Sequence, residues 1–146
     1  MYRAQRRNSP LCVAILDLDD FKQFNDTFGH DAGDSLLREL GWVIREKLRK
    51  SDILCRYGGD EFVLVLSDST LPDAKKRVEQ ICAVVKEMQT DRAEPRPGAI
   101  TVSVGIAQAG VDASNATELL RAADKALYAA KRTGRDRIAV YEAKKS

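Results

Sequence analysis

Apolar positions along the chain form short runs and longer stripes with helical spacing, and the two patterns alternate. Apolar runs of strand length predict strands at residues 11–16, 53–57, 61–66, 100–107 and 138–141. Stripes with helical periodicity predict helices at about residues 21–28, 34–50 and 72–88, and a last helix that follows capping residues 112–115 and ends near residue 131. The predicted order of elements is therefore β-α-α-β-β-α-β-α-β.

This order indicates an α/β protein of the α+β type. We expect one central mixed sheet of about five strands, with helices packed against it, because a hairpin gives antiparallel pairing and helical crossovers give parallel pairing. The chain has 146 residues, of which 44% are hydrophobic. That length and composition predict a single domain over residues 1–146 with one core.

The charge balance excludes some classes of partner. Lys and Arg total 24 and Asp and Glu total 22, which gives a net charge of +2. Such a balance does not predict a nucleic-acid-binding or membrane surface, and no stretch resembles a signal peptide or a membrane span. We expect a cytoplasmic domain with no nucleic-acid partner and no direct membrane insertion. A membrane anchor elsewhere in a longer parent protein is compatible with this expectation.

The cysteines do not predict a functional site. Cys12, Cys55 and Cys82 are scattered along the chain, without the spacing of a disulfide framework or a zinc site. Each lies in an apolar run, so we expect all three to be small core residues.

Acidic residues follow two of the predicted strands. Asp17 comes after the first strand, and Asp60 and Glu61 come after the hairpin turn. If these strands are neighbours, the three carboxylates converge, and they raise one another's pKa unless a cation neutralises them. Oxygen ligands of this kind suit Mg²⁺ or Mn²⁺. Asp60 and Glu61 alone favour a solvated turn with surface acids, and Asp17 shifts the balance towards a metal site.

Two glycines separate the strands of the predicted hairpin. Gly58 and Gly59 predict a tight turn that requires positive φ. They also leave the backbone accessible to a phosphate, as in glycine-rich phosphate loops. A glycine pair by itself is more typical of a turn than of a phosphate site.

Basic residues that could bind a phosphate lie near two helix ends. Lys22 is in the first turn of the short helix, where backbone N–H groups favour anions. Lys131 and Arg135 flank the end of the last helix, where each could simply complement the helix dipole. Together, three such cations could neutralise a metal-bound triphosphate.

Asn25 and Asp34 are candidates for base recognition. An Asn side chain offers a donor and an acceptor, and an Asp carboxylate accepts from N1–H and N2–H₂ of guanine. Asp34 is also placed to cap the second helix, and the two roles are compatible.

Several motifs in order resemble the GGDEF family of diguanylate cyclases. The matching segments are 17–22 (DLDDFK), 25–30 (NDTFGH) with 33–34 (GD), 56–62 (RYGGDEF), 101–107 (TVSVGIA), 123–128 (ADKALY), 130–131 (AK) and 134–135 (GR). The resemblance covers almost the whole chain from Leu11 onward. It implies a palm-like nucleotide-cyclase fold and the condensation of two GTP into cyclic di-GMP with release of pyrophosphate.

The resemblance also implies roles for individual residues. Asp17 and Asp60 would hold two Mg²⁺ or Mn²⁺ ions with help from the Leu18 carbonyl, and Glu61 would be a further ligand or would aid deprotonation of the 3′-hydroxyl. Lys22, Lys131 and Arg135 would bind phosphates beside Gly58 and Gly59, and Asn25 and Asp34 would bind guanine.

Each 3′-hydroxyl must attack the α-phosphate of the other nucleotide, so the reaction implies a two-fold homodimer. The R-x-x-D sequence at Arg49 and Asp52 resembles the family's inhibitory site for cyclic di-GMP. Gln80 stands where some members carry a further Arg, so cross-linking of domains by product would differ here.

Only ten residues precede the first strand, and the family's usual N-terminal motif is missing. We therefore expect that the chain lacks its N-terminal segment and an upstream sensor domain. This departure favours an alternative function, a catalytically idle domain that binds GTP or cyclic di-GMP, whereas intact Asp17, Asp60 and Glu61 favour an active cyclase. A nucleotidyl cyclase with a different product is a third possibility, which Asn25 and Asp34 disfavour.

Overall fold

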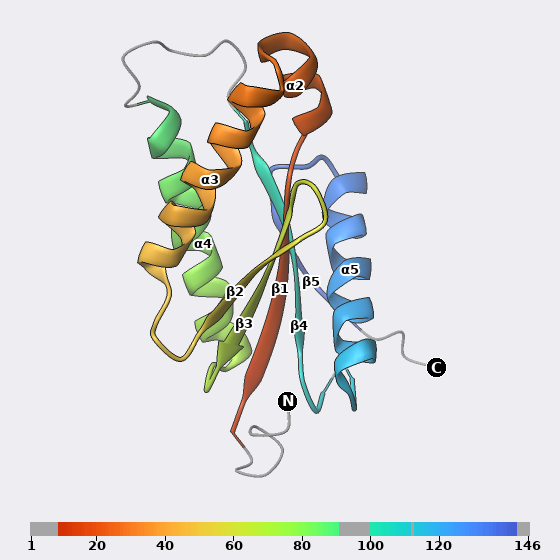
Figure 1. Cartoon of the computed structure of the whole chain (residues 1–146). Coiled ribbons are helices and arrows are strands. Elements are labelled where there is room, and N and C mark those ends of the chain that lie inside the picture. The colour runs from red at the N-terminus through yellow and green to blue at the C-terminus, as the bar shows by residue number, and fades with distance from the viewer. Residues whose placement is uncertain (1–8, 91–99, 112, 143–146) are drawn as a thin grey trace.

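The computed structural model describes residues 9–90, 100–111 and 113–142, which form a five-stranded sheet with helices on both faces (Figure 1). The strands are β1 (Leu11–Leu18), β2 (Ile53–Tyr57), β3 (Glu61–Ser67), β4 (Val102–Gln108) and β5 (Ile138–Val140). The helices are α2 (Phe21–Phe28), α3 (His30–Lys47), α4 (Leu71–Thr90) and α5 (Ala116–Arg132). The predicted order of elements is confirmed.

Strand β1 lies at the centre of the sheet, whose order is β2-β3-β1-β4-β5. It pairs antiparallel with β3 and with β4, and β5 pairs parallel with β4. The sheet is therefore mixed, as predicted. Helices α3 and α4 cover one face and α5 covers the other (Figure 1).

Alternate residues of β1 point to opposite faces of the sheet. Ala14 and Leu16 belong to the core under α3 and α4, whereas Val13 and Ile15 belong to the core under α5. Because both faces are covered, all eight residues of β1 are buried, which explains its continuous apolar run. The same alternation places Asp17 on the face covered by α5.

Helix α5 lies directly against β4 because of one glycine. A Cβ atom at Gly105 would collide with the Ala123 carbonyl oxygen and the Leu127 nitrogen of α5. The helix begins after Asn115, whose side chain accepts a hydrogen bond of 2.9 Å from the Glu118 N–H. This close packing fixes the end of α5, where Lys131 lies, relative to the sheet.

The bounds of α3 differ from the prediction of about residues 34–50. The helix begins at His30 because Gly29, with φ of 93°, ends α2 and caps α3 at the same position. Asp34 therefore lies inside the helix, and its predicted role as a cap is wrong. The helix ends at Lys47, so Arg49 and Asp52 lie in the turn before β2.

Two further expectations need correction. β1 continues to Leu18, and β4 begins at Val102 rather than at residue 100. Cys12 is buried and Cys82 is half-buried, but Cys55 is exposed on the edge strand β2. An apolar neighbourhood in sequence does not bury a residue on a sheet edge.

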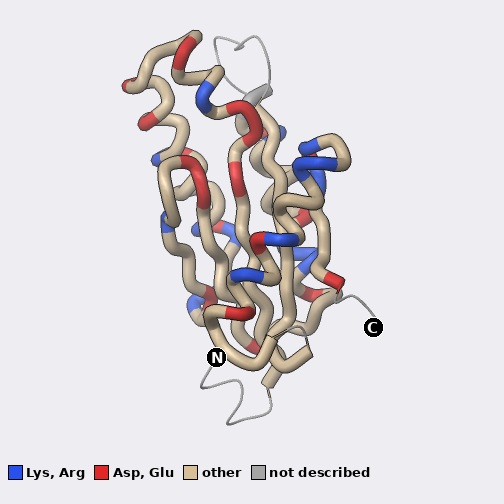
Figure 2. Tube along the Cα trace, turned by 90° about the vertical axis from the view of Figure 1, so that its right-hand side faces the viewer, with Lys and Arg blue, Asp and Glu red and all other residues tan. Residues whose placement is uncertain are grey.

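Charges of both signs are spread over the molecule. Figure 2 shows Lys and Arg segments interspersed with Asp and Glu segments, in agreement with the small net charge. Within the described residues, no helix is long and apolar enough to cross a membrane.

Candidate active site and a second charged cluster

The end of β1 and the β2–β3 hairpin meet at one end of the sheet. Asp17 pairs with Glu61 in the β1–β3 register, and the Leu18 N–H donates a hydrogen bond of 3.3 Å to the Asp60 carbonyl oxygen. The expectation that these strands are neighbours is confirmed. Asp17, Asp60 and Glu61 are thereby brought together from segments more than forty residues apart in sequence.

Asp17 is a buried carboxylate in which one oxygen lacks a hydrogen-bond partner. Its Oδ2 lies 2.8 Å from Lys131 Nζ, whereas its Oδ1 is buried with no hydrogen-bond partner. Burial raises the pKa of Asp17 to about 6; the bond to Lys131 opposes this shift, and the nearby Asp60 carboxylate adds to it. The pKa of Glu61 is also raised, first by burial and then by the charges of Asp124 and Asp60.

These residues fit a divalent cation. Their donor atoms are oxygens, one buried oxygen of Asp17 lacks a partner, and the carboxylates destabilise one another's charged forms. Within the described part of the chain, however, no three acidic, His or Cys side chains already stand in an arrangement that could ligate one ion. The acceptors are therefore gathered, but a complete ligand set is not preformed.

The hairpin turn is longer than the tight turn that the sequence suggested. Tyr57 pairs with Glu61, which leaves a three-residue loop that contains Gly58, Gly59 and Asp60. Only Gly58 has positive φ, at 77°, so the turn does not require glycine at position 59. A Cβ atom at Gly59 would meet no protein atom within 4 Å, so the backbone there faces open space.

Two of the predicted phosphate-binding cations reach the end of β1. Besides Asp17, Lys131 Nζ lies 3.6 Å from Asp19 Oδ1, and Arg135 Nη1 lies 3.9 Å from Asp20 Oδ1. Lys22 is exposed in the first turn of α2, two residues after Asp20. The structure therefore places cations from α5 and its following loop beside the carboxylates at the end of β1 and just after it.

The sequence analysis gave no role to Asp19, although it is the most buried carboxylate of this region. Its Oδ2 accepts from Thr101 Oγ1 at 2.6 Å and from the Asp136 N–H at 3.0 Å, and its Oδ1 accepts from Ser103 Oγ at 2.7 Å. Burial raises its pKa, but the hydrogen bonds outweigh burial and hold the pKa below its usual value. Its spacing of two residues from Asp17, which places both on one face, was a signal for it.

The two candidate base-recognition residues lie on neighbouring helices. Asn25 of α2 is half-buried, and its Oδ1 has no hydrogen-bond partner. A Cβ atom at Gly33 of α3 would collide with that oxygen, so the two helices meet there. Asp34 follows Gly33 and is exposed. The junction of α2 and α3 therefore has a buried amide oxygen without a partner, with an exposed carboxylate beside it.

A second charged cluster surrounds the R-x-x-D sequence. Arg49 Nη2 lies 3.4 Å from Asp52 Oδ1 and donates to Ser69 Oγ at 2.7 Å and to the Ser67 carbonyl oxygen. The Asp52 side chain is fully buried. Arg77 of α4 joins the cluster, with Nη1 3.2 Å from Ser69 Oγ and 3.6 Å from Asp52 Oδ2.

Arg77 was missed by the sequence analysis, which considered Gln80 at this helix. Gln80 is exposed, and Arg77 lies almost one helical turn before it. The cluster therefore contains two arginines of the same chain, and only the tertiary packing of α4 against the turn at residues 48–52 reveals the second.

Comparisons with known proteins agree on one family. The sequence model described as "Diguanylate cyclase, GGDEF domain" matches residues 1–137. Diguanylate cyclase DosC of Escherichia coli K12 is 37% identical over 140 residues, and response regulator PleD of Caulobacter vibrioides is 36% identical over 137 residues. These matches cover 96% and 93% of this chain but only 30% of each relative, so the chain spans less than a third of their length.

Solved structures agree as well. The active GGEEF domain of a diguanylate cyclase from Vibrio cholerae superposes with a TM-score of 0.89 at 31% identity, over 98% of this chain and 90% of that one. The GGDEF domain of DgcB from Caulobacter crescentus, in complex with c-di-GMP, has a TM-score of 0.85 at 35% identity, over 95% and 82% of the two chains.

Proposed function

The chain belongs to the GGDEF family of diguanylate cyclase domains, and from this premise we propose that it condenses two GTP molecules into cyclic di-GMP and two pyrophosphates. The observation that carries the proposal is the carboxyl of Asp17. One of its oxygens is paired with Lys131, and the other is buried without a partner beside Asp60. Such a site suits a cation that itself carries an anionic substrate.

Asp17, Asp60 and Glu61, with the Leu18 carbonyl, would hold Mg²⁺ or Mn²⁺, two ions per active site. The bound metal would supply charge stabilisation at the reacting phosphate and favour ionisation of the attacking hydroxyl. Glu61, with its raised pKa, is suited either to ligate the metal or to accept the hydroxyl proton.

The phosphates would lie between the hairpin loop and the end of α5. Lys131 is paired with Asp17 and Arg135 with Asp20, and both would exchange these partners for phosphate oxygens. Lys22 would approach from the first turn of α2. The open backbone at Gly59 supports this placement, since no side chain stands between it and a bound anion.

Guanine would be bound at the junction of α2 and α3. Asn25 Oδ1 is buried against Gly33 without a partner, and the amide would turn this oxygen outward to accept a hydrogen bond from the base. The exposed Asp34 carboxylate would accept from the two donors on the Watson–Crick edge of guanine. Adenine offers no such pair of donors at those positions, so this arrangement favours GTP.

The reaction requires two copies of the domain. In each half-reaction the 3′-oxygen of one GTP forms a bond to the α-phosphorus of the other, the bond to pyrophosphate breaks, and the hydroxyl proton leaves. One domain binds one GTP, so two active sites would face each other across a two-fold axis. A longer parent protein with a sensor domain would bring the copies together, and the greater length of DosC and PleD supports such a context.

Arg49 and Asp52, with Arg77, would form an inhibitory site for cyclic di-GMP. Two arginines can donate to guanine and phosphate oxygens, and the buried Asp52 carboxylate, which is paired with both arginines, would hold them in place. The crystallised complex of the DgcB GGDEF domain with c-di-GMP shows that a relative binds this nucleotide.

The direct experiment incubates the chain with GTP and Mg²⁺, both alone and fused to a dimeric coiled coil, and separates the products by chromatography. Cyclic di-GMP with two equivalents of pyrophosphate is the expected result for the dimerised form. No turnover there, or pyrophosphate without cyclic di-GMP, would overturn the proposal and favour an idle nucleotide-binding domain.

A further inference from the structure

The loop between α5 and β5 has an unusual backbone. Gly134, Arg135 and Asp136 have φ of 136°, 60° and 48°, so three successive residues lie in the left-handed region. Residues other than glycine disfavour that region, because their Cβ atom crowds the backbone. Arg135, a proposed phosphate ligand, is therefore presented by a loop that requires external restraint.

Three backbone hydrogen bonds restrain this loop at its two ends. At the start, the Arg135 N–H donates to the Ala130 carbonyl oxygen at 3.0 Å. At the other end, the Val104 N–H donates to the Arg137 carbonyl oxygen at 3.0 Å, and Asp136 donates its N–H to Asp19. Of these three bonds, only the one to Asp19 involves a side chain, and within the loop Arg137 Nε also donates to the Arg135 carbonyl oxygen at 3.0 Å.

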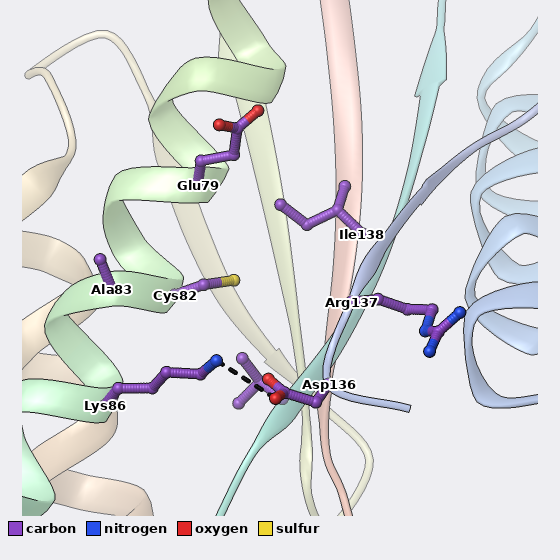
Figure 3. Close-up of a pocket in the computed structure, with 8 residues that line it drawn as sticks. Glu79, Cys82, Ala83, Lys86, Asp136, Arg137 and Ile138 are labelled. Carbon is purple, nitrogen blue, oxygen red and sulfur yellow. Dashed lines mark ion pairs between the residues drawn. The ribbon is translucent and has the colours of Figure 1, made fainter. Parts of the chain in front are cut away.

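A second contact of Asp136 lies on the opposite side of the loop. Its carboxylate is 3.1 Å from Lys86 Nζ of α4, across a pocket of about 280 Å³ that also includes Cys82 and Ile138 (Figure 3). Both side chains of this ion pair are about half exposed, so water and salt weaken it. The ion pair is therefore a weak restraint compared with a buried charged acceptor.

Asp19 is such an acceptor. It is 3% exposed, and its two oxygens together accept from Thr101, Ser103 and the Asp136 N–H. These donors belong to the start of β4 and to the loop, so one carboxylate joins the end of β1 to both. The carboxylate points into protein and has no open side for a nucleotide.

We propose that Asp19 is a positioning residue for the triphosphate of GTP, which it does not touch: by holding the Asp136 N–H it keeps the left-handed loop in the conformation that presents Arg135. The inference rests on the function proposed above. Asp17 and Asp19, two residues apart on one face, thus have different tasks, since one faces the reacting phosphate and the other holds the loop that binds it.

The test uses Asp19→Asn and measures nucleotide binding by calorimetry in the presence of Mg²⁺. An amide keeps the shape of the side chain but turns one acceptor into a donor. The amide can turn its NH₂ towards the Ser103 hydroxyl, which can accept, and keep its oxygen on the Asp136 N–H, so this bond remains but loses its charge assistance. We expect the Kd for GTP to rise by about fivefold, the effect of weakening one charge-assisted contact to a neutral one, and the Kd for GMP to stay the same.

Thr101→Val provides a second, isosteric variant in case Asp19→Asn folds poorly. It removes the shorter of the two hydrogen bonds to Oδ2 and should raise the Kd for GTP, but not for GMP, by a smaller factor. Lys86→Gln is the control on the other side of the loop and should change the Kd for GTP by less than about twofold.

A double-mutant cycle then shows whether Asp19 acts through Arg135. In an Arg135→Ala background, Asp19→Asn should lose most of its effect on the Kd for GTP, and the remainder measures its 3.6 Å contact with Lys131. Additive effects, an equal loss of GMP and GTP binding, or unchanged GTP binding by a folded Asp19→Asn chain would each overturn the inference. A wild-type chain that binds no GTP would instead overturn the proposed function.

Discussion

The ammonium of Lys131 lies 2.8 Å from Oδ2 of Asp17, while Oδ1 of the same carboxyl is buried without a partner. One protein cation thus neutralises one side of the carboxylate and leaves the other side for a second cation. A ligand that brings both a metal and phosphates would satisfy both groups, since the metal could take Asp17 and the phosphates could take Lys131. This pairing explains how the fold tolerates a buried acid beside Asp60.

Asp60→Ala should abolish turnover of the dimerised domain. Metal assistance supplies several kcal/mol of transition-state stabilisation, and each 1.36 kcal/mol is a factor of ten in rate, so we expect a loss of about 1000-fold or more. Calorimetry should show unchanged binding of cyclic di-GMP at Arg49, because Arg49 and Asp52 precede β2 whereas Asp60 follows it, in the hairpin loop. A variant that retains turnover within about tenfold of wild type contradicts the role of Asp60.

The stability of the metal-free chain should depend on pH through Asp17. Its pKa is raised from 3.8 to about 6 on folding, so between these values the native state binds more protons than the unfolded state. Stability contributed by this group is therefore lost as the pH rises through that window. The Tm of wild type minus that of Asp17→Asn should fall from about pH 4 to about pH 6 and then level off.

Mg²⁺ should reverse that trend, because the metal competes with the proton on Asp17. The increase in Tm on adding Mg²⁺ should be small near pH 4, should grow as the carboxyl ionises, and should be absent in Asp17→Asn. An equal increase in both proteins at all pH values would place the metal elsewhere.

Gly58 and Gly59 should differ when each is changed to Ala. Gly58 has φ of 77°, so Gly58→Ala should lower the free energy of unfolding by about 1–2 kcal/mol in urea denaturation. Gly59 lacks positive φ and faces open space, so Gly59→Ala should leave stability unchanged and weaken GTP binding. The reverse pattern would show that the turn, not a phosphate, requires the second glycine.

Gly33→Ala should damage guanine recognition selectively. The added methyl group would collide with Asn25 Oδ1 and would lie 3.1 Å from the Phe21 ring. Displacement of the Asn25 amide should raise the Kd for GTP and GMP by a similar factor, about tenfold for one lost hydrogen bond to the base. Binding of inorganic triphosphate with Mg²⁺ is the control and should not change.

Arg49→Ala should remove the cyclic di-GMP site, for which we expect micromolar or better affinity in the wild-type chain. Arg77→Ala should weaken the same binding, because Arg77 contacts both Ser69 and Asp52. Arg45→Ala is a matched control, since Arg45 is an exposed arginine in the last turn of α3, four residues before Arg49. Calorimetry that detects no binding to wild type, or equal binding to Arg49→Ala, refutes an inhibitory site here.

Much of the fold was determined by the sequence alone. The continuous apolar run before Asp17 gave a strand covered on both faces, and the helical stripes gave the helices, because burial imposes a period on the chain. The turn at Gly58 and the end of α2 at Gly29 also followed from local backbone preference. The start of α3 did not, since Gly29 serves two helices at once and patterns define helix ends poorly.

The candidate site was only partly determined in this way. Motif order identified Asp17, Asp60, Lys131 and Arg135, but tertiary structure alone decided which of them meet, because contacts across strands leave no periodic trace in sequence. Asp19 and Arg77 became visible only in the packed molecule. Asp19 is defined by donors more than eighty residues away, and Arg77 by a helix that packs against a distant turn. A buried charge is specified by its partners, and the fold chooses those partners.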